Sequence, residues 1–299
     1  MPATARAYTF DVEQPDYAGI LKDQGYVIIR GLMPRAKVGA LYADLKERFE
    51  KTPFCEGEFY GPHTKRFGAL LKRSQHAAGF VANPTVLEIA QGILGPFCES
   101  FQLNNTQALE IWPGAPQQVH HRDQGMWPVP IGQVEYMFNV MWPFMPYREE
   151  NGATLVWPGS NRCQEVNQID RAFAIAAEME PGDALVYLGS TMHAAGANRS
   201  DKPRTGMIVG YSLGWLKQFE NQFLCYPPEI ARTFPPDLAA LVGYRQHRPN
   251  LGNYEGQCPS IVLQDNVPEY IHSVDGLTAE QLALVAQFKA SQAGEPVLG

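Results

Sequence analysis

The chain has 299 residues, a formal net charge of −7 and 45% hydrophobic residues, which is enough apolar material for a sizeable core. It contains no cluster of Lys and Arg, so its composition argues against nucleic acid or an anionic membrane surface as a partner. No apolar run reaches the length that spans a bilayer, and the first residues contain no hydrophobic stretch typical of a secretory signal.

The first hundred residues predict helices around one early strand. Residues 25–30 form an apolar run expected to be a buried strand, and helices are expected from Pro34 onward and over residues 84–94. The first helix carries an apolar stripe at helical spacing, formed by Val38, Leu41, Leu45 and Phe49. Residues 54–72 are rich in Gly, Pro and aromatic residues without clean periodicity, which predicts a long loop of the kind that often serves as a lid.

Short apolar segments separated by Gly and Pro turns dominate the rest of the chain. The segments expected to be strands are residues 101–112, 134–142, 153–157, 184–188 and 205–211. This pattern favours a mainly β fold with flanking helices, closed into a double-stranded β-helix, the jelly-roll barrel of cupin-like proteins. The tail from Gln218 is expected to be helical and loop-like, with a capping box at residues 278–281.

The cysteine pattern predicts free thiols. The five cysteines are widely spaced, include no Cys-x-x-Cys pair and are odd in number. Thiols of this kind are typical of a reducing compartment, so a cytoplasmic location is expected.

Two short segments carry the residue types of a metal site. His121 and Asp123 are two residues apart, and in a strand such residues project from the same face while Arg122 points away. His193, in a later segment, supplies a second imidazole. Two imidazoles and one carboxylate are the ligand set of non-haem iron(II) oxygenases, which keep the remaining metal positions open for a co-substrate and dioxygen. His120 would face the opposite side of such a strand, so we expect it to be a packing residue.

Arg204 adds a second part to the pattern, because His-x-Asp alone occurs often by chance. It follows His193 by eleven residues. A planar guanidinium binds a carboxylate through two parallel hydrogen bonds. We therefore expect a metal to hold the 2-oxo acid end of a co-substrate and Arg204 to hold its far carboxylate.

With these residues in place, the chain resembles the phytanoyl-CoA dioxygenase family of iron(II)/2-oxoglutarate oxygenases, and most closely its branch that oxidises terpenoid and alkaloid natural products. The matching stretches are His121-Arg122-Asp123 and residues 150–160, 181–186 and 193–204, in the family's order. The resemblance runs from about residue 20 to about residue 220. At Gly159-Ser160-Asn161 the family usually has Gly-Ser-His, and this turn is generally structural.

The resemblance implies Fe(II), 2-oxoglutarate as co-substrate and O2, with decarboxylation to succinate coupled to oxidation of a substrate. His121, Asp123 and His193 would hold the iron. The residues implied to contact 2-oxoglutarate are Arg204, Thr154, Gln118 and Arg66. The outcome would be hydroxylation, desaturation or rearrangement.

The expected substrate is a small to medium, largely apolar metabolite such as a terpenoid. The residues expected to form the walls of its pocket are Met126, Trp127, Phe138 and Tyr60. We expect one oxygenase domain over residues 1–299: helices, early strands and a lid loop over about 1–100, a jelly-roll core over about 101–215, and a helical and loop extension over about 216–299. The resemblance alone suggests a homodimer formed through the C-terminal region.

Three alternatives remain open at this point. A cupin-type metalloenzyme that does not use 2-oxoglutarate would keep both histidines and Asp123 but would not need Arg204. A serine hydrolase could use Ser212, because residues 210–214 read Gly-Tyr-Ser-Leu-Gly and match the nucleophile-elbow pattern, although no alternation of strands and helices supports that fold. A non-catalytic binding protein would keep the barrel but would tolerate loss of ligands.

Overall fold

The computed structural model describes residues 15–128, 130, 133–163 and 171–293, and the chain divides into two compact units, Met1–Pro227 and Pro228–Gly299. The helices of the first unit are α1 (Tyr17–Gln24), α2 (Arg35–Lys51), α3 (Ala77–Val81), α4 (Pro84–Ile93) and α5 (Gln222–Cys225). Its strands are β1 (Tyr26–Ile29), β2 (Thr64–Gly68), β3 (Phe101–Ile111), β4 (Met137–Pro143), β5 (Thr154–Val156), β6 (Ile175–Ala176), β7 (Ala184–Leu188), β8 (His193–Ala195) and β9 (Arg204–Leu213).

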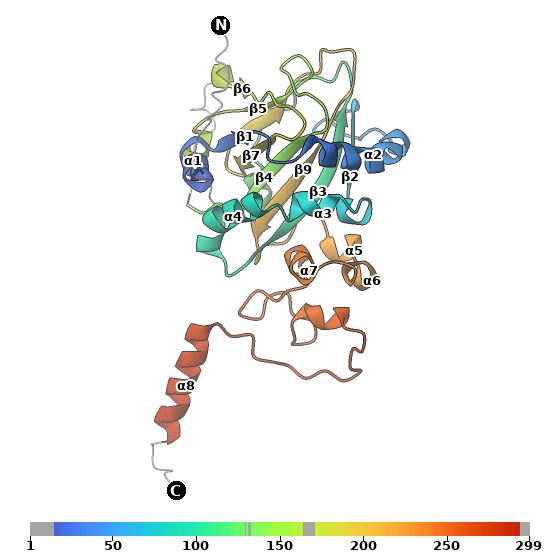
Figure 1. The fold of residues 1–299 in the computed structure, drawn as a ribbon. Coiled ribbons are helices and arrows are strands. Elements are labelled where there is room, and N and C mark those ends of the chain that lie inside the picture. The colour runs from blue at the N-terminus through green and yellow to red at the C-terminus, as the bar shows by residue number, and fades with distance from the viewer. Residues whose placement is uncertain (1–14, 129, 131–132, 164–170, 294–299) are drawn as a thin grey trace. The chain divides into compact units, whose positions relative to one another are not determined.

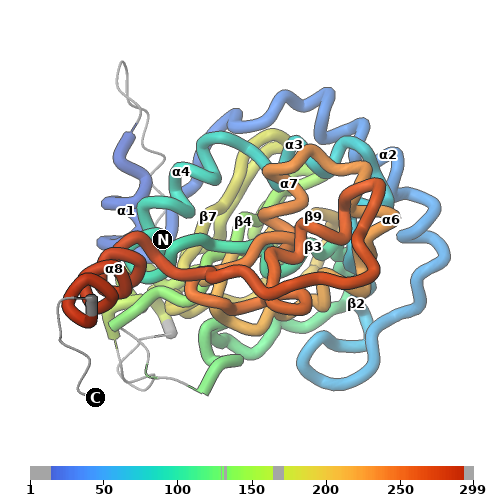
Figure 2. Tube along the Cα trace, turned by 90° about the horizontal axis from the view of Figure 1, so that it is seen from below, coloured from blue at the N-terminus to red at the C-terminus, as the bar shows by residue number. Residues whose placement is uncertain are grey.

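The strands form two antiparallel sheets. The larger sheet has the order β1-β7-β4-β9-β3-β2 (Figures 1 and 2). The smaller sheet has the order β6-β5-β8. Tyr147, Met179 and Val156 pack with Met141 and Tyr187 of the larger sheet in one apolar core. The mainly β fold with flanking helices that the sequence predicts is thereby confirmed.

The strand β4 shows how the larger sheet separates two environments. All seven of its residues are buried, so both of its faces are covered. On one face Phe138 stacks on Tyr211 and Trp142 meets Phe80 of α3 edge-on, with ring centroids 5.0 and 5.1 Å apart. The hydroxyl of Tyr211 also donates to the Val81 carbonyl at 2.6 Å, which fixes α3 on this face. The opposite face is left for the cavity described below.

The predicted loop over residues 54–72 is wrong in part. Its second half contains β2, which pairs along its whole length with β3, and a 3-10 turn at Leu70–Lys72. The segment Thr-Lys-Arg-Phe-Gly has little apolar alternation, so its strand conformation comes from pairing with the long neighbour β3 and not from local pattern.

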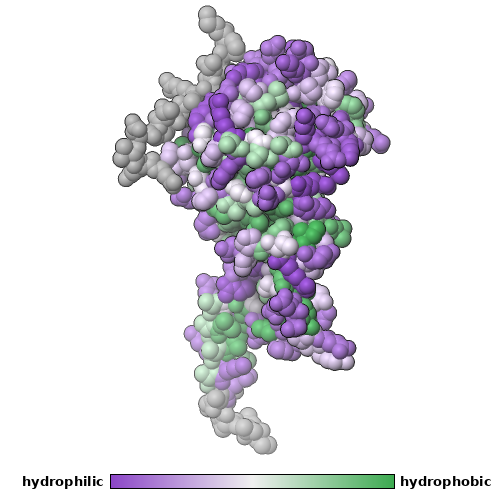
Figure 3. Space-filling view, turned by 45° about the vertical axis from the view of Figure 1, so that its right-hand side comes forward, coloured by the Kyte–Doolittle hydropathy of each residue, from purple (hydrophilic) through white to green (hydrophobic). Residues whose placement is uncertain are grey.

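The second unit contains α6 (Pro228–Ala231), α7 (Pro236–Val242) and α8 (Ala279–Ala293). The capping box at α8 is confirmed: the Thr278 amide donates to the Gln281 side chain at 3.0 Å, and the Gln281 amide donates to the Thr278 hydroxyl at 3.3 Å. Apolar side chains of α8, including Leu284 and Phe288, are exposed, and Figure 3 shows hydrophobic surface over this unit. Across the described residues, no helix is long and apolar enough to cross a membrane.

Candidate active site

A short backbone pairing brings the predicted metal ligands together. The amide of His121 donates to the His193 carbonyl at 2.9 Å, and the amide of His193 donates back at 3.0 Å. This single bridge joins the segment before β4 to the first residue of β8. The predicted strand through Asp123 is wrong, because Asp123 begins a 3-10 turn that ends at Met126. The turn nevertheless directs the carboxylate toward both imidazoles.

The three side chains form a compact group of donor atoms. The Nε2 atoms of His121 and His193 each lie 3.4 Å from an oxygen of Asp123, and the two imidazole centroids are 4.4 Å apart. One ligand atom from each residue can be chosen so that all lie within 4.8 Å of one another. Arg122 points away, as expected, and donates to the Ser160 carbonyl at 2.7 Å. His120 lies outside the group and packs near Trp157.

Backbone carbonyls fix which imidazole nitrogen faces the group. The Nδ1 atom of His121 lies 2.8 Å from the Val119 carbonyl, and that of His193 lies 3.1 Å from the Thr191 carbonyl. A carbonyl only accepts, so each Nδ1 carries a hydrogen and each Nε2 is the nitrogen that can offer a lone pair to a metal, once the metal displaces any proton shared with Asp123. Two such nitrogens and one carboxylate suit a divalent transition metal such as Fe(II), so the donor set fits the expected ion.

Electrostatics keep Asp123 ionised inside the protein. Burial alone would raise the pKa of Asp123, but the nearby His193 and His121 hold it well below its ordinary value. Burial would lower the pKa of His193, and the Asp123 carboxylate outweighs this and raises it. Asn139 of β4 also donates from Nδ2 to Asp123 Oδ2 at 2.5 Å. A metal ion would replace the proton shared by this group, so its affinity should fall in acid.

The group opens onto a cavity of about 330 Å³ between the two sheets. The larger sheet contributes side chains from β2, β3, β4, β7 and β9, and the smaller sheet contributes Thr154 and His193. Apolar side chains of the lining include Leu109, Met137, Met141 and Ile208. The lining therefore mixes these apolar side chains with polar and charged ones, among them several amides and arginines.

Arg204, the first residue of β9, faces this cavity and is 1% exposed. Its Nε and Nη1 atoms are buried without a hydrogen-bond partner among the described residues. The guanidinium lies over the ring of Tyr147, 4.4 Å from the ring centroid, which supports the cation without neutralising it. A buried guanidinium with free N–H groups fits a carboxylate, and thus one end of 2-oxoglutarate.

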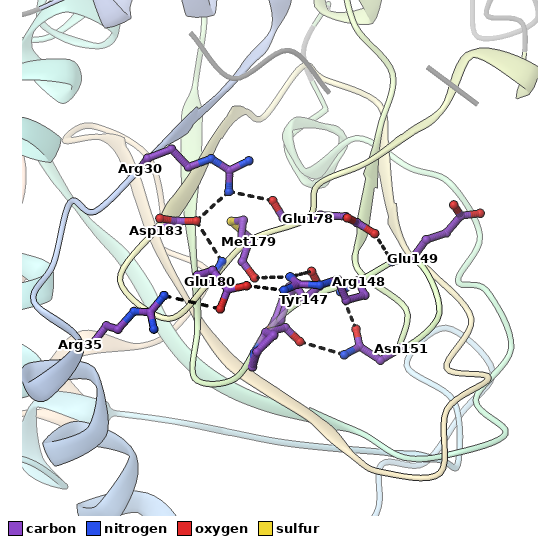
Figure 4. Close-up of polar contacts among 11 residues, drawn as sticks. Arg30, Arg35, Tyr147, Arg148, Glu149, Asn151, Glu178, Met179, Glu180 and Asp183 are labelled. Carbon is purple, nitrogen blue, oxygen red and sulfur yellow. Dashed lines mark hydrogen bonds and ion pairs between the residues drawn. The ribbon is translucent and has the colours of Figure 1, made fainter. Parts of the chain in front are cut away.

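A polar network holds Tyr147 in place (Figure 4). The backbone of Tyr147 pairs with Met179, and Arg148 forms an ion pair with Glu180. Asp183 accepts from the amide of Glu180 at 2.9 Å and from Arg30 at 2.7 Å. Gly206 leaves room for the phenol, because a Cβ there would lie 2.1 Å from the Tyr147 hydroxyl.

The other residues expected near the co-substrate also line the cavity. Arg66 has its guanidinium 4.6 Å from the centroid of the Tyr60 ring, donates to Gln107 at 2.8 Å, and has no partner for Nε among the described residues. Burial lowers its pKa from the ordinary value. Gln118 accepts from the Ala195 amide at 3.2 Å and donates to the Phe59 carbonyl at 3.3 Å. Thr154 is 4% exposed and faces the cavity from β5.

Two of the four residues expected to form the pocket walls line the cavity, and two do not. Met126 and Tyr60 line the cavity. Phe138 does not, because it lies on the opposite face of β4 against Tyr211. Trp127 is also outside the lining and donates from its indole to the Lys217 carbonyl at 3.2 Å.

The sequence analysis did not identify several of the residues that line the cavity. Asn139 interrupts an apolar run, which was a usable signal, since a lone amide in a buried strand needs a partner. Asn104 and Asn105 both face the cavity because the pairing of β3 with β9 shifts between Leu103 and Asn105. Phe219 reaches the cavity from the segment after β9, and no pattern in the sequence indicates it.

The hydrolase alternative fails on geometry. Ser212 lies inside β9 and is completely buried, and no turn into a helix follows it directly. A nucleophile elbow needs its serine exposed on a sharp strand-to-helix turn.

The metal group, the cavity and the buried guanidinium agree with the similarities to known proteins. Residues 21–206 match the family model described as phytanoyl-CoA dioxygenase (PhyH). The chain is 33% identical to the dioxygenase aneA of Aspergillus aculeatus over 247 residues, covering 77% of this chain and 83% of that protein. It is 28% identical to the multifunctional dioxygenase ausE of Aspergillus calidoustus over 264 residues, covering 82% and 86%.

Among solved structures, the chain is similar to SnoN, an α-ketoglutarate-dependent non-haem epimerase of nogalamycin biosynthesis. The TM-score is 0.56 at 17% identity, covering 66% of this chain and 81% of SnoN. A second SnoN structure contains Fe3+, α-ketoglutarate and nogalamycin RO. This chain belongs to the phytanoyl-CoA dioxygenase family of iron- and 2-oxoglutarate-dependent dioxygenases.

Proposed function

We propose that this protein oxidises a small to medium, largely apolar metabolite, such as a terpenoid or another natural product, with Fe(II), 2-oxoglutarate and O2. The observation that carries the proposal is Arg204, a buried guanidinium with two nitrogen atoms that have no hydrogen-bond partner among the described residues, in the same cavity as His121, Asp123 and His193. A metal site alone would not need this cation. A dicarboxylate co-substrate would need both groups.

The residues divide the work of binding between them. His121, Asp123 and His193 would hold Fe(II), and the bound ion supplies activation of dioxygen coupled to decarboxylation of the 2-oxo acid. Arg204, on its Tyr147 support, would bind the far carboxylate of 2-oxoglutarate, with Thr154 beside it. Arg66 and Gln118, which also line the cavity, would contact 2-oxoglutarate as well.

The apolar mouth supports an apolar substrate. Phe59, Met126 and Phe219 line the cavity, yet they are 48%, 43% and 49% exposed. Large apolar side chains that are exposed around a cavity are typical of a binding site for an apolar molecule. The Phe59 ring also meets the His121 ring edge-on at 4.9 Å, so this mouth leads directly to the metal ligands.

The first test is an anaerobic titration of metal-free protein with Fe(II) and then 2-oxoglutarate, followed by visible absorption. A weak charge-transfer band on adding 2-oxoglutarate is the expected result, because bidentate binding of a 2-oxo acid to Fe(II) produces it. Terpenoids and other apolar metabolites are then screened for oxygen-dependent release of succinate. Bound iron without a band would favour a cupin-type enzyme that uses the same three ligands for other chemistry.

The expected partner is a small molecule. Dimerisation through the C-terminal region and a cytoplasmic location stay predictions, and each has a direct measurement: light scattering of the purified protein and microscopy of a tagged chain.

A further inference from the structure

A row of paired residues crosses the larger sheet beside the metal group. Gly210 of β9 lies opposite Asn139 of β4 on one side and opposite Asn105 of β3 on the other. Asn139 in turn lies opposite Tyr187 of β7, whose ring centroid is 4.6 Å from that of His193. Directly paired residues project from the same face of a sheet, and Asn105, Asn139 and Tyr187 all line the cavity.

Asp123 fixes the orientation of the Asn139 amide. Asn139 Nδ2 lies 2.5 Å from Asp123 Oδ2, and an ionised carboxylate only accepts hydrogen bonds. The Asn139 oxygen must therefore face the other way, toward Gly210. It lies 2.7 Å from the point where a Cβ on residue 210 would stand, and the Asn105 oxygen lies 2.3 Å from the same point.

Glycine at position 210 is required for space and not for backbone conformation. Its φ lies outside the left-handed region, and it sits in the regular pairing of β9 with β4. Without a side chain between them, the two amides lean over the strand and lie next to each other. A methyl group at position 210 would force the Asn105 amide aside.

The two amides have hydrogen-bonding capacity that the protein leaves unused. Asn105 is 8% and Asn139 is 2% exposed. Within the described part of the chain, no side-chain hydrogen bond involves the Asn105 amide, and the Asn139 amide is engaged by Asp123 and by the neighbouring Tyr187 hydroxyl, which leaves its oxygen lone pairs open toward Gly210. Both amides line the cavity, so a molecule bound there can pair with them.

We propose that Asn105 and Asn139 form a subsite for a hydroxyl group on an otherwise apolar substrate. A hydroxyl can donate to the Asn139 oxygen and at the same time accept from the Asn105 amide, which is free to turn its nitrogen inward. A carboxylate has no hydrogen for the Asn139 oxygen, and a ketone can use only the Asn105 amide. The inference rests on the proposed function and adds to it the substrate class: an alcohol.

The position of the subsite also constrains where oxidation occurs. The Asn139 amide touches a metal ligand, so a hydroxyl held there lies next to the metal. The rest of the substrate would extend along the apolar lining, which includes Met137, Ile208 and Phe219. Oxidation is expected at a carbon close to the one that carries the hydroxyl.

The test compares matched compounds on wild-type protein and two variants. The probes are borneol, camphor and camphane, followed by other terpenoid alcohols with their ketone and deoxy counterparts. After the Fe(II)–2-oxoglutarate band is established, each compound is scored by its dissociation constant, from perturbation of the band, and by the succinate release it triggers. Wild type is expected to favour alcohols over hydrocarbons by at least about tenfold, because a site built for a hydroxyl disfavours an analogue that lacks it.

Asn105→Leu removes one hydrogen-bonding partner, and Gly210→Ala displaces the same amide by its added methyl group. Both are expected to reduce the preference for alcohols to less than about threefold while the affinity for 2-oxoglutarate stays as in wild type. Gly39→Ala is the matched control, since an added Cβ there meets nothing within 4 Å. Thermal unfolding of each variant verifies that it folds.

Four outcomes are distinguishable. Alcohol preference that both variants lose supports the subsite. Equal response to alcohols and hydrocarbons, or a band that no alcohol perturbs, overturns it. Weaker 2-oxoglutarate binding by Asn105→Leu also overturns it, by assigning the amides to the co-substrate. If no band forms in wild-type protein, the proposed function itself fails, and with it the substrate assignment.

Discussion

The two ends of the cavity differ in how their polar atoms are satisfied. At the metal end, the Nδ1 atoms of both histidines meet backbone carbonyls, and Asp123 receives a hydrogen bond from Asn139. At the other end, the Arg204 guanidinium keeps two N–H atoms without a partner among the described residues. The metal end is oriented before any ligand arrives, whereas the guanidinium end is completed only by an anion.

The two ends therefore differ in how they affect the stability of the ligand-free protein and the free energy of ligand binding. Hydrogen bonds that fix the imidazoles stabilise the empty protein and also reduce the reorganisation needed to bind a metal. A buried cation without a partner destabilises the empty protein, and a ligand that pairs with it recovers that free energy on binding. Substitutions at the two ends should therefore affect stability in different directions.

The largest expected effect is at the metal end. Asp123→Ala removes the only carboxylate of the group and leaves two imidazoles to hold the metal. Loss of a residue that merely orients a ligand costs about 10–100-fold, so loss of the ligand itself should reduce Fe(II)-dependent turnover by about 1,000-fold or more. Iron content after desalting and the 2-oxoglutarate band measure this. Retention of both in Asp123→Ala would show that the carboxylate is not a ligand.

The second effect is at the guanidinium end. Arg204→Met should weaken 2-oxoglutarate binding by about 100-fold, because a charge-assisted bidentate pair contributes about 2–3 kcal/mol. Fe(II) binding should not change. Arg204→Lys should recover part of the affinity, since it keeps the charge without the fork. Arg199→Met serves as the control, because Arg199 is an exposed arginine in the segment just before β9.

Stability gives the opposite comparison for the same variant. Metal-free Arg204→Met should unfold at the same temperature as wild type or at a higher one, because it removes a buried charge that has a cation–π contact but no carboxylate partner among the described residues. A clear drop in melting temperature would contradict the idea that this end is incomplete without an anion.

A smaller effect is expected from the support beneath Arg204. Gly206→Ala places a Cβ 2.1 Å from the Tyr147 hydroxyl and 2.8 Å from the Trp142 carbonyl, so the Tyr147 ring must move. Loss of a buried cation–π contact of about 1–2 kcal/mol should weaken 2-oxoglutarate binding by about tenfold. Tyr147→Phe keeps the ring and should bind within about threefold of wild type. Equal losses in both variants would assign the support to the hydroxyl instead.

The same comparison explains what the sequence could predict. His121, Asp123, His193 and Arg204 are residue types with specific chemistry, and the structure places all of them around one cavity. Their identity was enough, even though the strand assumed for Asp123 is a 3-10 turn. The error in secondary structure did not change which residues were expected at the site, because a short segment can direct a side chain to one point from more than one backbone conformation.

The walls of the cavity could not be predicted in this way. The strand β4 is buried on both faces, so alternation cannot tell the face that carries Phe138 from the one that carries Asn139. The irregularity between Leu103 and Asn105 depends on the neighbouring strand, and the place of Phe219 depends on hydrogen bonds to Asn104. These features arise from tertiary pairing and leave no local pattern.

Glu135 offers the finest test of the metal end. It lies just before β4 and accepts from the hydroxyl of Ser190, three residues before His193. Gln124, next to Asp123, makes a second link of this kind. Its side-chain Nε2 donates to the Val134 carbonyl at 2.8 Å, and its backbone amide donates to the Gly189 carbonyl at 3.0 Å. The two ligand segments are thus joined through the residues around Glu135. The second carboxyl oxygen is buried without a partner among the described residues.

Burial raises the pKa of Glu135 to about 7, against the lowering effects of Ser190 and Arg122. A raised pKa in the folded state means that this carboxyl stabilises the fold fully below its unfolded pKa near 4.5, and that this contribution is lost as the pH rises through about 7. The loss should be on the order of 1–3 kcal/mol. Urea unfolding of metal-free protein between pH 5 and 8 should therefore show a decline that is clearly smaller in Glu135→Gln than in wild type, and the remaining decline belongs to His193, whose raised pKa acts in the same direction. The exposed Glu149→Gln should retain the wild-type decline, and so should Arg204→Met, because this linkage belongs to the metal end alone. An unchanged decline in Glu135→Gln would show that another group sets the pH dependence.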